Sequence, residues 1–80
     1  MMLKVKYIRT DDDVIIVFCE LLQHSEFKRF NPISAGFISF GVNNQGNPSC
    51  TCYGESVSLN LQSMEDDTML ARRQILGDIY

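Results

Sequence analysis

The chain has few of the residues that mark a dedicated function. It lacks Trp, has a single His, and shows no catalytic or ligand-binding motif at a recognised spacing. Its longest apolar run, Val14 to Cys19, is far shorter than the ~20 residues that span a bilayer, and no basic N-terminus precedes a cleavable apolar stretch. We therefore expect no membrane association and a cytoplasmic location.

Cysteines are few, and their number is odd. Of Cys19, Cys50 and Cys52, one stays unpaired in any intramolecular disulfide scheme. Cys50 and Cys52 are separated by one residue on a predicted strand, so their side chains point to the same face without the geometry of a disulfide. We expect reduced cysteines in a reducing compartment.

Basic residues are also scarce. The net charge is -3 and the pI is about 4.8, which makes nucleic acid an unlikely partner because non-specific affinity comes from clustered Lys and Arg. Eighty residues suffice for one small domain, covering 1–80, with a thin core.

The first half of the chain predicts two strands. Alternation of apolar and basic residues predicts a strand over 3–9, with Leu3, Val5 and Tyr7 on one face. Thr10 to Asp13 breaks the pattern, and four of the next five residues are β-branched, which favours a strand over 13–19 and a short helix within 20–30. Asn31-Pro32 ends that helix. The alternative is one helix over 13–30, giving a βαββα order.

The second half predicts a long hairpin and a helix. Two β-rich runs, 34–42 and 49–61, bracket a Gly/Asn/Pro turn. Ser63 is then expected to cap a helix over 65–77, which Gly77 ends. The apolar residues expected on its buried side are Met69, Leu70, Ile75, Leu76 and Ile79.

These elements predict an α+β domain: an antiparallel sheet of four or five strands, packed on one face by the C-terminal helix. Strand parity places Ile38, Phe40 and Val42 on one face of their strand, and Ile33 and Phe37 on the other. In the next strand, Val57, Leu59 and Leu61 are expected to share a face. One helix cannot cover both apolar faces, so the second face should meet the 20–30 segment or another subunit.

Two segments and one set of scattered residues partly match sites of known chemistry. Gly36 to Phe40 matches the tail of the aromatic strand with which RNA-recognition domains stack bases. Gly54 to Ser58 partly matches the nucleophile elbow of serine hydrolases, for which His24 is the available base. Cys19, His24, Cys50 and Cys52 include zinc-ligand types, but not at the C-x2-4-C spacing of structural sites. Sheet packing, a strand bend and buried thiols are the simpler interpretations.

The charged clusters have similarly plain interpretations. Asp11 to Asp13 and Glu65 to Asp67 lack the pattern of a calcium loop and fit a turn and a helix start. Lys28-Arg29 and Arg72-Arg73 could bind an anion jointly if the fold joined them, although separate solvated positions are the favoured alternative.

The runs 33–40, 52–61 and 65–77 resemble small uncharacterised bacterial proteins of the kind carried on accessory or mobile genetic elements. The resemblance implies a bacterial, cytosolic setting and no particular activity. We expect a non-enzymatic interaction module that self-associates as a homodimer, with Ile33 and Phe37 as candidate interface residues and with no catalytic, cofactor or metal site. The alternatives are a nucleic-acid-binding accessory protein and, third, a small enzyme or metal-binding protein.

Overall fold

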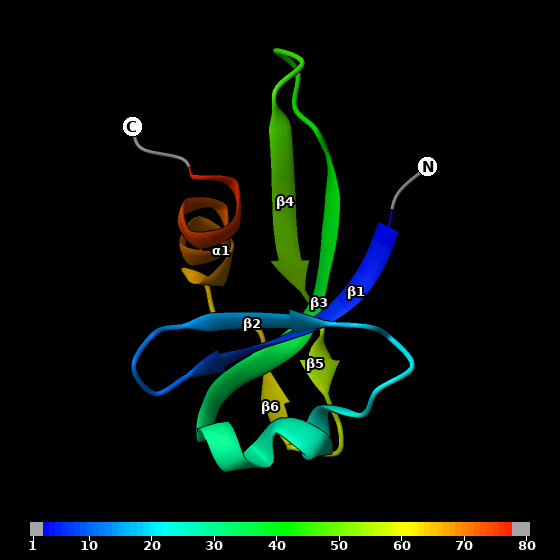
Figure 1. Ribbon diagram of the computed structural model, residues 1–80, viewed down its shortest axis with the longest axis vertical. Helices are drawn as coiled ribbons and strands as arrows, with labels where there is room; N and C mark the ends of the chain where they lie inside the picture. The colour runs from blue at the N-terminus through cyan, green and yellow to red at the C-terminus, as the bar shows by residue number, and fades with distance from the viewer. Residues whose placement is uncertain (1–2, 78–80) are drawn as a thin grey trace.

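Figure 1 shows the computed structural model, which describes residues 3–77 and the side chains from Val5 onward. In chain order the elements are β1 (Leu3–Thr10), β2 (Ile15–Phe18), the 3-10 helix η1 (His24–Phe30), β3 (Pro32–Val42), β4 (Pro48–Tyr53), β5 (Glu55–Ser56), β6 (Leu61–Gln62) and α1 (Asp67–Leu76). The main sheet is antiparallel with the order β2-β1-β3-β4, and β5 and β6 form a second small sheet. The predicted α+β class is confirmed.

β1 and β2 form the tight hairpin predicted from the three aspartates. The Thr10 N–H donates to the Val14 carbonyl at 2.9 Å, and Asp13 has a positive φ of 66°, which Asp tolerates in turns. The β-branched residues that follow pair with β1 from Ile15 to Phe18. The strand interpretation is therefore correct, and the alternative of a helix over 13–30 is wrong.

Each face of the sheet has its own small core. On one face Tyr7, Ile38 and Cys50 pack with Ala71 of α1. On the other, Ile8, Phe18 and Ala35 pack with Phe27 of η1 and with Leu59 and Leu61. Phe40 packs against the first core, as its parity with Ile38 predicts. Of the two covers expected for the second face, the 20–30 segment is present, together with the segment that contains β6.

The predicted strand over 49–61 is wrong beyond residue 53. Gly54 has a φ of 79°, and a Cβ atom there would lie 3.0 Å from the Phe37 ring. The chain turns at this glycine, and the Ser56 hydroxyl then accepts the Leu59 N–H at 3.2 Å, closing a turn between β5 and β6. Val57 is consequently 86% exposed and does not share a buried face with Leu59 and Leu61.

α1 is shorter than predicted and is not capped by Ser63. Its N-cap is Asp66, without a side-chain cap bond, and the Asp67 carboxylate instead accepts the Met64 N–H at 2.9 Å. Gly77 ends the helix with a left-handed φ of 68°, as predicted. Leu70 and Leu76 pack against the core, but Met69 and Ile75 are exposed, and Ile79 lies outside the described residues. Within residues 3–77, no helix combines the length and apolar character needed to cross a bilayer.

The end of the β3–β4 hairpin, residues 41–48, extends beyond the rest of the molecule (Figure 1). We call this segment the arm. The side chains from 41 to 48 are all exposed, and Val42 is 70% exposed. Asn43 closes the tip, because its side chain accepts the N–H groups of Gln45 and Asn47. The arm is therefore a well-formed hairpin with little cover from the remaining described residues.

Candidate functional site

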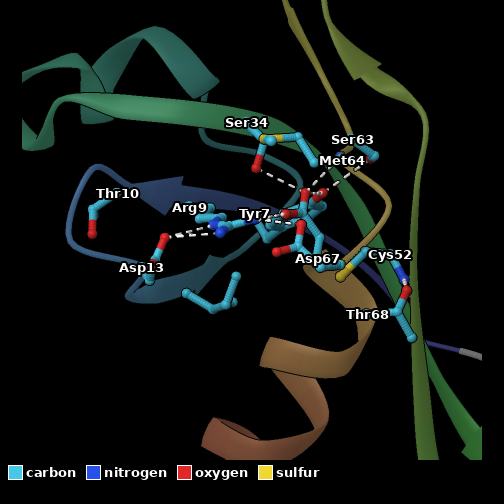
Figure 2. Close-up of polar contacts among 12 residues, drawn as sticks. Tyr7, Arg9, Thr10, Asp13, Ser34, Cys52, Ser63, Met64, Asp67 and Thr68 are labelled. Atoms are coloured by element: carbon cyan, nitrogen blue, oxygen red, sulfur yellow. Dashed lines mark hydrogen bonds and ion pairs between the residues drawn. The ribbon is translucent and has the colours of Figure 1, made fainter.

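A cluster of buried polar side chains lies where the start of α1 meets the sheet (Figure 2). The Asp67 side chain is fully buried. Its Oδ2 accepts hydrogen bonds from the Tyr7 hydroxyl, from the Ser34 hydroxyl at 2.8 Å and from the Met64 N–H. Its Oδ1 accepts from Arg9 Nη1 at 3.0 Å. One carboxylate thereby joins α1 to β1 and β3.

Arg9 is the buried cation of this cluster. Besides Asp67, its guanidinium contacts Asp66 at 2.7 Å and Asp13 at 2.8 Å. The hydrogen bond with Asp66 raises the pKa of Arg9 and, in return, lowers the pKa of Asp66. Burial, followed by the hydrogen bond to Asp67, raises the pKa of the Tyr7 hydroxyl. The cluster is therefore held as an ionised Arg with neutral Tyr.

The polar groups of this cluster are hydrogen-bonded to one another. Among the described residues, no buried side-chain nitrogen or oxygen lacks a hydrogen-bond partner. The donors around Asp67 are thus directed at its carboxylate and not at an open space. The sequence interpretation missed the pairing of Arg9 with Asp67. The alternation Val5, Tyr7, Arg9 was the available signal, because it places Arg9 on a buried face, where a cation needs an anionic partner.

The opposite face of the sheet carries a shallow, solvent-open cavity of about 630 Å³. It is lined by Lys6 of β1, His24 of η1, Phe37 of β3, Tyr53 of β4 and the segment 54–58. This volume lies within the range of roughly 300–1,000 Å³ that is usual for small-molecule sites. Its size and its aromatic and charged lining make this cavity a candidate functional site.

Aromatic rings form one wall of this cavity. Phe37 and Tyr53 are stacked, with ring centroids 5.9 Å apart and planes at 29°. The His24 ring meets Phe37 edge-on, also at 5.9 Å. Phe37 and Tyr53 lie opposite each other in the β3–β4 register, which explains the stacking.

His24 is positioned by the start of η1. The Gln23 N–H donates to the Glu26 side chain at 2.8 Å, a reciprocal cap that fixes the first turn. The His24 Nε2 lies 2.8 Å from the Gly36 carbonyl oxygen and so carries the proton. Burial lowers the pKa of His24, and nearby Lys6 lowers it further, so the ring is neutral near pH 7. Nδ1 is left as a hydrogen-bond acceptor.

The cavity brings together residues that the sequence linked only through the partial match to a serine hydrolase. His24, Ser56 and Ser58 all contribute to its lining. Ser56 Oγ accepts the Leu59 N–H and lies 3.3 Å from Ser58 Oγ. Within residues 3–77 neither serine is hydrogen-bonded to His24. Gly54 bends the strand, which matches the structural interpretation of this motif.

The cysteines and His24 do not come together. Cys50 and Cys52 share a face, as predicted, and that face is covered by α1, whereas His24 lies on the opposite one. Cys19 is exposed. Burial, reinforced by Cys50 and Asp67, raises the pKa of Cys52 to about 12. No three His, Cys, Asp or Glu side chains in the described residues gather as metal ligands would.

The two candidate interface residues occupy different environments. Ile33 is 39% exposed, near the start of β3. Phe37 is half-buried within the monomer, between the rings of His24 and Tyr53. Their role at an interface stays a prediction.

The two basic pairs are far apart in the fold. Arg29 lies over the Phe30 ring on η1, 4.8 Å from its centroid. Arg72, on α1, donates to the Cys50 carbonyl at 3.0 Å. Since η1 and α1 cover opposite faces of the sheet, the pairs do not form a joint anion site.

Comparison with protein-family models, with curated proteins and with solved structures finds no match to this chain.

Proposed function

We propose that the chain is a small, non-enzymatic interaction module that self-associates as a homodimer through the β3–β4 arm. One observation carries the proposal: residues 30–54, which include both strands, contain no charged residue. Interface cores are depleted of charge, and an exposed uncharged hairpin is prone to pair. Two copies can therefore approach through this hairpin without repulsion, despite a net charge of -3.

The exposed apolar side chain of the arm indicates where the copies would meet. Val42 is 70% exposed close to the tip, and a two-fold axis there would bring the two Val42 side chains together. Closer to the body, the outer edge of β4 is engaged, because Arg72 donates to the Cys50 carbonyl. These contacts favour the distal arm over the body as the site of association. The three free cysteines support a cytoplasmic setting.

The test is sedimentation equilibrium at about 100 μM, far above the micromolar dissociation constant of a modest specific interface. We expect a dimer for the wild type and a monomer for Val42→Asp. Val57→Asp is the matched control, because Val57 is an even more exposed valine outside the uncharged hairpin, and this variant should remain dimeric. Circular dichroism confirms that each variant is folded.

Two results would overturn the proposal. A monomeric wild type at that concentration excludes self-association. A dimer that survives Val42→Asp but dissociates with Ile33→Asp would move the interface from the arm to the start of β3, where the sequence interpretation had placed it.

A further inference from the structure

We propose that the cavity beside Tyr53 binds a nucleoside monophosphate whose base carries an amino group. The cavity combines three features that no element of the fold requires together: an aromatic wall, a cation and an anionic residue. It lies on the body of the molecule and does not include the exposed tip of the arm, so this proposal is independent of self-association.

The aromatic wall suits a planar base. Tyr53 is 40% exposed where it lines the cavity, and its ring is stacked with the ring of Phe37, which lines the cavity beside it. Phe37 is itself held by the edge of His24, which fixes the orientation of the platform. Stacking on aromatic rings is a main source of affinity for bases in protein sites.

Lys6 supplies the positive charge for one phosphate. Its ammonium donates one hydrogen bond to the Leu22 carbonyl at 2.8 Å, which holds the side chain in place. An ammonium has three donors, so two stay available to an anion. Among the lining residues that the structure describes, Lys6 is the one that carries a positive charge, and the chain is acidic overall. This charge fits a single phosphate group and not a polynucleotide.

The remaining polar residues of the lining include one anion, Glu55. Glu55, Ser56 and Ser58 contribute to the lining together with Gln23, and Glu55 is exposed. A carboxylate beside a stacking platform repels a second anion but accepts hydrogen bonds from an amino group on a base. The hydroxyl of Ser58, which is an exposed residue, suits the sugar. The arrangement thus places phosphate near Lys6 and the amino edge of the base near Glu55.

Isothermal titration calorimetry with adenosine monophosphate tests the proposal. We expect saturable binding, weakened about tenfold or more when the phosphate is removed (adenosine) or the base is removed (ribose 5-phosphate). Inosine monophosphate, in which a carbonyl replaces the amino group, should also bind about tenfold more weakly. Lys6→Gln and Tyr53→Ala should each reduce the affinity by a similar factor, whereas Tyr53→Phe should retain it.

Lys28→Gln is the control for charge, since Lys28 is an exposed lysine of η1 outside this cavity, and it should bind like the wild type. Three results would overturn the proposal: no saturable binding of adenosine monophosphate at millimolar concentration, equal affinity in Lys6→Gln, or tighter binding of an oligoadenylate than of the monophosphate. The last outcome would identify a single-stranded nucleic acid as the ligand. Sedimentation of the same samples separates a failure here from a failure of self-association.

Discussion

The Thr68 hydroxyl on α1 accepts a hydrogen bond from the backbone N–H of Cys52 on β4 at 2.9 Å. The helix makes a comparable contact with the other outer strand, where the Gln74 amide accepts the Ile15 N–H at 2.8 Å and donates to the Asp13 carbonyl at 2.7 Å. Polar side chains of α1 therefore occupy edge groups of both outer strands. Exposed edge groups are templates for pairing with other chains, so these contacts protect the body of the sheet.

Thr68→Val should destabilise the fold. The substitution keeps the shape of the side chain but leaves the partly buried Cys52 N–H without its acceptor, at a cost of about 1–3 kcal/mol. Urea denaturation measures the loss. Thr51→Val, on the exposed side of β4, is the control and should change the free energy of unfolding by no more than about 0.5 kcal/mol. Equal stability of the two variants would contradict the role of this edge contact.

Asp67→Asn should be the most damaging single change at the buried cluster. It removes the negative charge that Arg9 and Tyr7 face and should cost about 3–5 kcal/mol of unfolding free energy. Thermal unfolding followed by circular dichroism measures it. Asp11→Asn removes the same charge from an exposed turn residue and should leave stability within about 0.5 kcal/mol. A small effect of Asp67→Asn would show that the cluster contributes little.

Asp66 should make stability depend on acid pH. Because Arg9 lowers its pKa in the folded state, the ionised carboxylate stabilises the fold above the unfolded pKa of about 3.9. That contribution is lost as the pH falls through the lowered folded pKa. The stability difference between wild type and Asp66→Asn should therefore be constant above about pH 5 and shrink on acidification. Urea melts from pH 7 to pH 2 check this, and a difference independent of pH would contradict it.

The three thiols should differ in reactivity. Cys19 is exposed, whereas Cys50 is buried and the pKa of Cys52 is raised to about 12. Since the thiolate is the reactive form, iodoacetamide at pH 8 should label Cys19 first, and Cys50 and Cys52 only after denaturation. Peptide mass spectrometry reads out each site. Rapid labelling of Cys52 in the native protein would exclude the packing described for it.

Local patterns were sufficient to predict most of the sheet. Alternation identified β1, β-branching identified β2, and parity correctly separated Phe37 from Ile38 and Phe40. These features depend on side-chain periodicity, which a single sequence contains. A bend at Gly54 was predicted, but the end of the strand there was not. A β-rich composition on both sides of a glycine does not show whether the strand bends or leaves the sheet.

The candidate site was less predictable, because its residues come from distant segments. Lys6, His24 and Tyr53 are isolated in the sequence, and only the folding of η1 and the 54–58 segment onto one face brings them together. Asp67 was assigned to a helix start, which is its local position, but its partners Tyr7 and Ser34 depend on the register of β1 with β3. Such long-range pairings leave no local pattern.

The segment that leaves β4 at Gly54 has a consequence for how the molecule unfolds. Leu59 and Leu61 pack in the core beside η1, while Ser63, two residues later, lies 3.0 Å from the Tyr7 hydroxyl on the opposite face. A Cβ atom on Gly36 would lie 2.6 Å from Ser63 Oγ, so the chain passes β3 closely. We therefore expect that opening either core displaces this crossing. Two cores that are each too thin to persist alone should therefore melt in one cooperative transition.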